Sequence, residues 1–206
     1  MRGVTTGSQT LTYAREGLPL ADAGAVRYAL TAIGSALHLA SIAADGGHVS
    51  GRYFGDDIDA ATKFAIEANV TRNVYWTPNI ASPDCGHKPN KEQIIGLRYA
   101  FLDRDPPKDN APFDKLGIAS AVRRDAPTVI IDSGNGIQAF WQFEPMLATP
   151  ENKAALEGLN RTIIGRHGGD ASRSNIDSLM RLPGTVNWPS ARKLQRGCVP
   201  CLARIL

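Results

Sequence analysis

Two aspartates separated by one residue, Asp103 and Asp105, have the types and spacing best suited to chemistry in this chain. They follow an apolar run at 97–102 that is typical of a buried strand, and two prolines end that run because proline cannot donate to a sheet. Side chains alternate between strand faces, so the two carboxylates share one side and Arg104 takes the other. Like charges so close favour a shared cation, and carboxylate oxygens suit Mg²⁺ or Mn²⁺. The pair therefore predicts a divalent metal site, with an ordinary polar turn as the alternative.

The composition is that of a globular protein with a sizeable core, because 43% of the 206 residues are apolar. No apolar stretch approaches the roughly 20 residues of a membrane span. The N-terminus also lacks the apolar region of a signal peptide. Three cysteines are too few for a disulfide framework, which agrees with a reducing compartment. These features predict a cytoplasmic protein with no membrane partner.

The net charge of +3 conceals an asymmetry between the two parts of the chain. Residues 161–206 hold eight Lys or Arg and two Asp, a balance of +6, whereas residues 1–160 hold 15 bases and 18 acids, a balance of −3. A basic C-terminal part indicates a polyanionic partner, either nucleic acid or nucleotide. A solvated surface of scattered arginines is the alternative.

Helices and strands alternate on both sides of the carboxylate pair. Apolar spacing predicts a helix over 21–37, a hairpin of 39–43 and 49–54, and a helix from Asp56 or Asp57 to Asn69. After it we expect, in order, a strand from 74, a polar loop at 79–90, the carboxylate strand, a helix at 113–123, a hairpin of 128–131 and 137–143, a helix at 150–166 and a strand at 178–183. This order favours an α+β fold with a mixed sheet behind a helix-rich N-terminal part.

Two glycine-containing motifs follow the carboxylate pair. The Ser-Gly-Asn-Gly sequence at 133–136 suits a hairpin turn, and it equally suits a phosphate cradle of backbone N–H groups. Gly-Gly-Asp at 168–170 stands ahead of Met-Arg-Leu-Pro-Gly-Thr at 180–185. No Gly-x-x-x-x-Gly-Lys-[Ser/Thr] sequence is present, so an NTP-driven motor is not encoded here.

Taken together, Asp-x-Asp, the Ser-Gly-Asn-Gly turn before an aromatic strand, and Gly-Gly-Asp ahead of Met-Arg-Leu-Pro-Gly-Thr resemble the archaeo-eukaryotic primase superfamily. The nearest resemblance is to the primase-polymerase domains of phage and plasmid replication proteins, and it covers residues 73–206. It implies an RRM-like catalytic core with a mixed sheet. Within a single domain, 1–206, residues 1–70 would form the N-terminal α/β part and 71–206 the catalytic core. Such a domain commonly belongs to a longer replication protein.

The resemblance implies three metal-binding catalytic acids, Asp103, Asp105 and Asp170. Asp177 is the rival for the third place, and the spacing to the downstream arginine favours Asp170. The acids would hold two Mg²⁺ or Mn²⁺ ions for nucleotidyl transfer. The implied substrates are a single-stranded DNA template and an NTP or dNTP, and a helicase domain or protein is an implied partner.

The resemblance also implies a set of nucleotide-binding residues: Ser133, Gly134, Asn135, Gly136, Gln138, Arg181 and Lys88. The family carries histidine at the place of Gln138, where it contacts the incoming triphosphate. Glutamine donates a hydrogen bond but cannot become cationic, so we expect triphosphate binding to be weaker or to depend on Arg181 and Lys88.

Three alternatives remain open from the sequence. Paired acids serve a metal-dependent nuclease equally well. The departure at Gln138 keeps a non-catalytic, DNA-binding replication-initiation domain in consideration. Finally, two short pairs far apart in the sequence offer the ligands of a Cys₃His zinc site, a less favoured option than Mg²⁺ or Mn²⁺: Cys85 and His87, and Cys198 and Cys201.

Overall fold

The computed structural model describes residues 17–107 and 111–206 of the chain. Its elements are α1 Ala23–Ile33, β1 Leu37–Ala43, β2 Val49–Gly55, α2 Ile58–Asn69, β3 Arg72–Trp76, β4 Ile80–Ala81, β5 Ile94–Arg104, α3 Lys115–Arg123, β6 Val129–Asp132, β7 Ile137–Leu147, α4 Pro150–His167, the 3₁₀ turn η1 Ala171–Arg173, β8 Met180–Arg181, β9 Val186–Asn187, α5 Ala191–Gln195, β10 Cys201–Leu202 and β11 Arg204–Ile205. The expected α+β class is confirmed. Among the described helices, none is long and apolar enough to cross a membrane.

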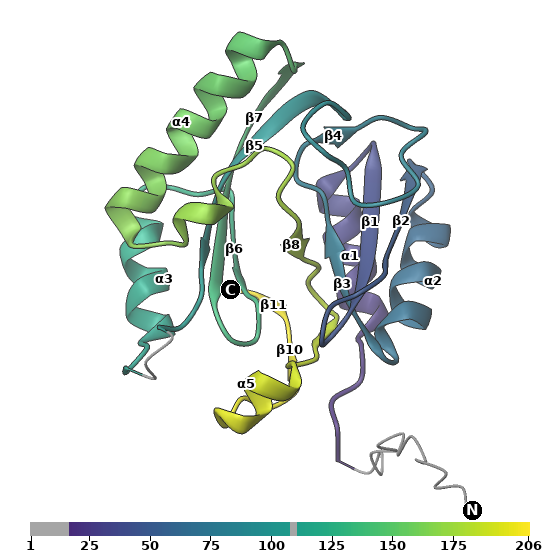
Figure 1. The fold of residues 1–206 in the computed structure, drawn as a ribbon, viewed down its shortest axis with the longest axis vertical. Helices are drawn as coiled ribbons and strands as arrows, with labels where there is room; N and C mark the ends of the chain where they lie inside the picture. The colour runs from purple at the N-terminus through teal and green to yellow at the C-terminus, as the bar shows by residue number, and fades with distance from the viewer. Residues whose placement is uncertain (1–16, 108–110) are drawn as a thin grey trace, which may run out of the picture.

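Two sheets lie beside each other, and helices pack against both of them (Figure 1). The first sheet has the order β2-β1-β3-β8 and the second the order β11-β6-β7-β5-β4, while β9 and β10 form a separate pair. The first sheet therefore takes strands from both the 1–70 and the 71–206 parts of the chain. Helices α1 and α2 lie on its side of the molecule, and α3 and α4 lie on the side of the second sheet (Figure 1).

Every strand pair in the described residues is antiparallel, where the sequence analysis expects a mixed sheet. The reason lies in two helical crossovers. Strands β2 and β3, joined through α2, run in the same direction, but β1 lies between them. In the same way β7 lies between β5 and β6, which are joined through α3. Each helical connection thus makes a split β-α-β unit, in which the two parallel strands never pair directly.

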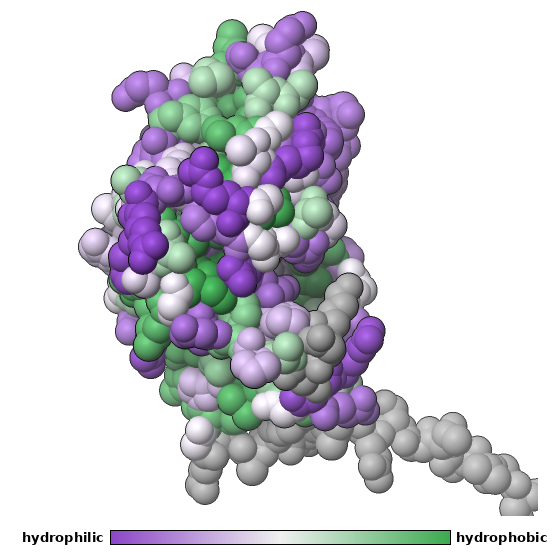
Figure 2. Space-filling view, turned by 90° about the vertical axis from the view of Figure 1, so that its left-hand side faces the viewer, coloured by the Kyte–Doolittle hydropathy of each residue, from purple (hydrophilic) through white to green (hydrophobic). Residues whose placement is uncertain are grey.

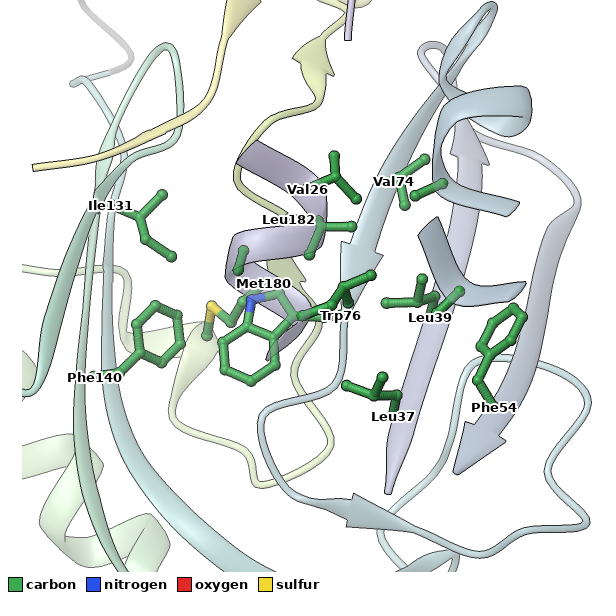
Figure 3. Close-up of a cluster of buried hydrophobic side chains, with 14 of the residues drawn as sticks. Val26, Leu37, Leu39, Phe54, Val74, Trp76, Ile131, Phe140, Met180 and Leu182 are labelled. Carbon is green, nitrogen blue, oxygen red and sulfur yellow. The ribbon is translucent and has the colours of Figure 1, made fainter. Parts of the chain in front are cut away.

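An aromatic core joins the two sheets (Figure 3). Trp76 of β3 packs on Phe140 of β7 with ring centroids 5.1 Å apart. It also meets Tyr99 of β5 edge-on, with a centroid distance of 5.5 Å. Met180 of β8 and Leu182, which follows β8, are fully buried in the same cluster. Each such side chain contributes roughly 1.5–3 kcal/mol through burial, so this cluster fixes how the two sheets sit relative to each other.

Local signals explain the helix starts. Asp57, Asp114 and Thr149 each accept a hydrogen bond from a backbone N–H three residues later, at the N-caps of α2, α3 and α4. On the outer face of α3 and α4, hydrophilic residues are interspersed with apolar ones (Figure 2). Inward, Leu156 and Ile164 of α4 are buried. The helices therefore close the outer side of the second sheet with a solvated layer.

Several expected boundaries move in the structure. The helix expected over 21–37 ends at Ile33, because Gly34 and Ala36 have φ of 84° and 53°, and Leu37 already opens β1. The loop expected at 79–90 contains the short strand β4, which pairs with β5. The last expected strand, 178–183, is reduced to the two residues of β8.

The carboxylate strand is longer than its apolar run. Strand β5 extends over 11 residues because β7, also of 11 residues, pairs with it along most of its length. Asp103 therefore lies inside β5, and Asp105 follows the strand's last residue.

Candidate active site

The pairing of β5 with β7 places Asp103 directly opposite Gln138. The Gln138 amide Nε2 donates to Asp103 Oδ1 at 3.1 Å. Its Oε1 accepts a hydrogen bond from the backbone N–H of Arg181 at 3.0 Å. One buried side chain thus fixes an acid of the second sheet and ties it to β8 of the first sheet. On the other face of β5, Arg104 donates to the backbone oxygen of His167, as strand alternation predicts.

A polar pocket of about 180 Å³ lies where the two sheets meet. Six of the residues singled out in the sequence line it, namely Asp103, Asp105, Ser133, Gln138, Arg181 and Lys88. Six further residues complete the lining: Ile42, Tyr75, Arg173, Leu179, Asn187 and Lys193. The pocket therefore joins the Asp-x-Asp strand, one residue of the Ser-Gly-Asn-Gly turn and the arginine of β8.

The ionisation of Asp103 in this pocket is perturbed by burial and by neighbouring charges. Burial and the negative charge of Asp105 raise its pKa to about 6, against the opposing effects of the Gln138 hydrogen bond and the Arg173 charge. Both causes of the rise penalise the ionised carboxylate, and a bound cation would offset both. The donor chemistry of Asp103 and Asp105 thus fits a hard divalent ion.

Gly168 and Gly169 bring Asp170 beside Asp103. Gly168 ends α4 in the left-handed conformation, with φ of 71°. At Gly169 a Cβ atom would lie 2.9 Å from the backbone oxygen of Asp103, so the chain passes there only because the residue is glycine. The backbone N–H of Asp170 then donates to that same oxygen at 2.9 Å. Neither Asp170 nor Asp177 lines the pocket, but the charge of Asp170, and not that of Asp177, acts on Asp103. The geometry favours Asp170 as the third acid.

The Asp170 carboxylate does not join the other two acids directly. Its Oδ1 caps η1 by accepting from the Ser172 backbone N–H at 2.9 Å and from Ser172 Oγ at 2.8 Å. Its Oδ2 lies 4.0 Å from Arg173 Nε, which is 3.8 Å from Asp103 Oδ2. Within residues 17–107 and 111–206, no three His, Cys, Asp or Glu side chains gather as a metal-binding group. Asp103 and Asp170 thus share Arg173 as a cation within 4.0 Å of both carboxylates.

Arg181 of β8 lines the pocket from the first sheet. Its guanidinium donates to Asn73 Oδ1 at 2.7 Å, to the Tyr75 hydroxyl at 3.1 Å and to Asn187 Oδ1 at 2.9 Å. It also lies over the Tyr75 ring, 4.3 Å from the centroid. Burial lowers the pKa of Arg181, and Tyr75 and the charges of Asp103 and Asp105 oppose this effect, while all three hydrogen-bond acceptors are neutral. A buried guanidinium whose hydrogen-bond acceptors are all neutral favours binding of a further anion.

The Ser-Gly-Asn-Gly turn is mostly occupied with its own hydrogen bonds. The Gly136 backbone N–H donates to Ser133 Oγ at 3.1 Å, and the Gly134 backbone N–H donates to Asp132 Oδ1 at 2.9 Å. Of the four turn residues only Ser133 lines the pocket. The geometry favours the hairpin turn over the phosphate cradle. Glycine is required at 136, because a Cβ atom there would lie 2.5 Å from the Arg104 backbone oxygen.

The two cysteine-containing pairs do not assemble. Cys85 Sγ lies 3.9 Å from His87 Nδ1, while Cys201 belongs to β10, which pairs with β9. These residues all fall in the described part of the chain, where no metal-binding group of three is found. The structure therefore does not bring together the Cys₃His set considered for zinc.

No sequence pattern marks the residues that hold Arg181. The same is true of Arg173 and Lys193, the two further cations that line the pocket. Asn73 and Tyr75 are two residues apart and therefore lie on the same face of β3. They look like ordinary strand residues until β8 is placed beside β3. Only the pairing of Tyr75 with Arg181, which are far apart in the sequence, reveals their role.

No protein-family model and no curated protein matches this sequence. Among solved structures, the AEP domain of the primase-polymerase from cyanophage S-2L is similar, with 16% identity, 91% of each chain covered and a TM-score of 0.62. The primase RepB′ is similar over 89% of this chain and 55% of its own, with 12% identity and a TM-score of 0.59. The catalytic domain of RepB′ in complex with initiator DNA aligns with 14% identity over 88% of this chain and 83% of its own, with a TM-score of 0.57.

The chain thus spans about 55% of the RepB′ chain and most of the two isolated catalytic domains. At identities this low, the likeness concerns the fold. It agrees with the resemblance carried by Asp103, Asp105 and the motifs that follow them. The chain has the fold of the RepB′ catalytic domain and of the AEP domain of the cyanophage S-2L primase-polymerase.

Proposed function

We propose that this protein is a primase-polymerase, which makes or extends oligonucleotides from NTPs or dNTPs on a single-stranded DNA template during phage or plasmid replication. One observation carries the proposal: a carboxylate pair from the second sheet and a buried arginine from the first sheet line the same pocket. The pair suits a cation and the guanidinium suits a phosphate, and nucleotidyl transfer needs both at one place. The fold supports this assignment.

Asp103 and Asp105 are the residues that would hold Mg²⁺ or Mn²⁺. A divalent ion bound there would lower the pKa of a primer 3′-hydroxyl and neutralise triphosphate charge. The protein's own contribution is positional. Gln138 fixes Asp103, and the neutral acceptors around Arg181 orient its guanidinium toward the pocket.

The role of Gln138 differs from that of the family's histidine. Both ends of its amide are engaged within the protein, one with Asp103 and one with the Arg181 backbone. This supports a function in which Arg181 and Lys88 bind the triphosphate and Gln138 organises the acid beside it. The DNA-bound neighbour and the basic C-terminal part favour DNA as the template. A helicase partner, within a longer replication protein or separate from it, belongs to the same proposal.

The test is incorporation of labelled nucleotides on single-stranded DNA with Mg²⁺ or Mn²⁺. Asp103→Asn and Asp105→Asn should each lower incorporation by about a hundredfold or more, because each removes a charge from the metal site. Asp177→Asn is the matched control and should stay close to the native protein, since Asp177 lies outside the pocket lining.

Two other results would replace the proposal. Loss of full-length DNA without added nucleotide, dependent on Asp103, would indicate a nuclease. Equal DNA binding by all variants, with no product from the native protein, would indicate a DNA-binding module.

A further inference from the structure

Arg173 lies close to Asp103, which the proposed function assigns to metal binding, and to Asp170, the third acid implied by the sequence resemblance. Its Nε is 3.8 Å from Asp103 Oδ2 and 4.0 Å from Asp170 Oδ2. Both distances exceed those of hydrogen bonds, so the attraction is electrostatic rather than directional. The side chain lines the pocket and is 46% exposed. The guanidinium therefore provides positive charge at the place where the two carboxylates need it, while half in solvent.

The backbone around Arg173 is fixed, in contrast to its side chain. Its N–H donates to the Asp170 backbone oxygen at 2.9 Å within η1. Asn160 of α4 donates to the Ser174 backbone oxygen at 3.0 Å and accepts from the Phe101 backbone N–H at 3.0 Å, which ties η1 to β5. The turn is thus anchored to the acid strand, and rotation about the Arg173 side-chain bonds is the motion that remains.

A guanidinium and a divalent cation cannot occupy the same position between carboxylates. Asp103 and Asp170 can act together on a metal only when the Arg173 head group has left the space between them. We infer that Arg173 is a tethered counter-ion, which balances Asp103 and Asp170 in the metal-free pocket and swings out when a divalent ion binds. This inference rests on the proposed function and assigns Arg173 as a positioning residue that competes with the metal.

The experiment measures Mn²⁺ affinity without nucleotide or DNA, by electron paramagnetic resonance of free Mn²⁺ and by calorimetry. Arg173→Gln removes the charge and keeps a similar length, and it should bind Mn²⁺ about threefold to tenfold more tightly than the native protein. Arg173→Lys keeps the charge and should behave like the native protein. The gain should shrink at high salt, because half-exposed charges are screened.

Arg161→Gln is the matched control, since Arg161 is an exposed arginine of α4 outside the pocket lining. It should leave Mn²⁺ affinity unchanged within about twofold. Urea unfolding of Arg173→Gln should match that of the native protein, because a half-exposed pair at these distances adds little stability. This separates the charge effect from a folding defect.

Failure of this inference differs from failure of the proposed function. If Mn²⁺ binds and Asp103→Asn abolishes binding, but Arg173→Gln does not tighten it, the counter-ion role is wrong and the metal site stands. If no variant binds Mn²⁺ in an Asp103-dependent way, both fail. A loss of nucleotide affinity in Arg173→Gln with unchanged Mn²⁺ affinity would make Arg173 a phosphate ligand and overturn the inference.

Discussion

The two sheets bring opposite charges to one pocket and stabilise them differently. The second sheet supplies Asp103. Burial and the charge of Asp105 disfavour its ionised form, and the charge of the nearby Arg173 partly offsets this penalty. The first sheet supplies Arg181, which is buried among neutral oxygen atoms of Asn73, Tyr75 and Asn187. The acid side can thus be balanced by the protein's own side chain. The cation side is ordered in advance and gains a directly bound anion only from a ligand.

The largest expected effect concerns Arg181, the buried cation that the first sheet supplies to the pocket. Arg181→Lys should weaken triphosphate binding by about a hundredfold, because an ammonium group cannot satisfy three spread acceptors and also face the pocket. Mn²⁺ affinity should not fall, since the acids remain. Titration with a fluorescent nucleotide and with Mn²⁺ measures both. Unchanged nucleotide affinity would show that the first sheet does not provide the anion site.

His38 of the first sheet should make the stability of the protein depend on pH. Burial lowers the pKa of His38 of β1 to about 4, while its ring nitrogens contact Thr77 Oγ1 and the Cys85 backbone oxygen. The folded state disfavours protonation, so stability is complete above the unfolded pKa of 6.5 and is lost as pH falls toward 4. Between pH 7 and pH 5 the loss should be about 2 kcal/mol.

Urea unfolding across this pH range tests the His38 effect against a His38→Gln variant, in which the loss from this position should disappear. An identical pH dependence in both proteins would assign the effect to other groups.

The approach of η1 to β5 depends on the missing side chain at Gly169. Gly169→Ala would place a methyl group 2.6 Å from Leu102 Cδ1. It should therefore destabilise the protein by about 1–2 kcal/mol and lower incorporation by moving Asp170. Gly165→Ala in α4, where nothing lies within 4 Å, is the control and should stabilise by about 0.5–1 kcal/mol. Equal urea unfolding curves for the two variants would contradict this reading of the turn.

The smallest expected effect concerns Gln138, whose hydrogen bonds connect the two sheets. Gln138→Leu removes the hydrogen bonds to Asp103 and to the Arg181 backbone. We expect a loss of about 1 kcal/mol in unfolding free energy, because leucine replaces part of the lost packing. Incorporation should fall more than stability does, since Asp103 loses its orientation. Parallel urea unfolding and incorporation assays compare the two, and proportionate changes would make Gln138 a structural residue only.

The parts of the fold predicted from the sequence are those with local causes. Strand alternation placed Asp103 and Asp105 on one side, and capping residues such as Asp57 marked helix starts. The ending of α1 at Ile33 was missed although Gly34 is a glycine C-cap, because the apolar spacing of a helix continues to Leu37. The setting of Arg181 and the position of Arg173 could not be predicted, because they depend on contacts between residues far apart in the chain.

The pairing of β3 with β8 also governs when the pocket can exist during synthesis. Asp103 and its strand leave the ribosome well before Arg181. The arginine that donates a hydrogen bond to the Tyr75 hydroxyl lies 106 positions later in the chain. Closing so long a loop is slow relative to forming a local hairpin. A nascent chain therefore carries the acids of the second sheet without the opposing cation until residue 181 has been made. On the proposed function, the carboxylate pair of Asp103 and Asp105 can form early in such a chain, whereas triphosphate binding would require that β8 has docked.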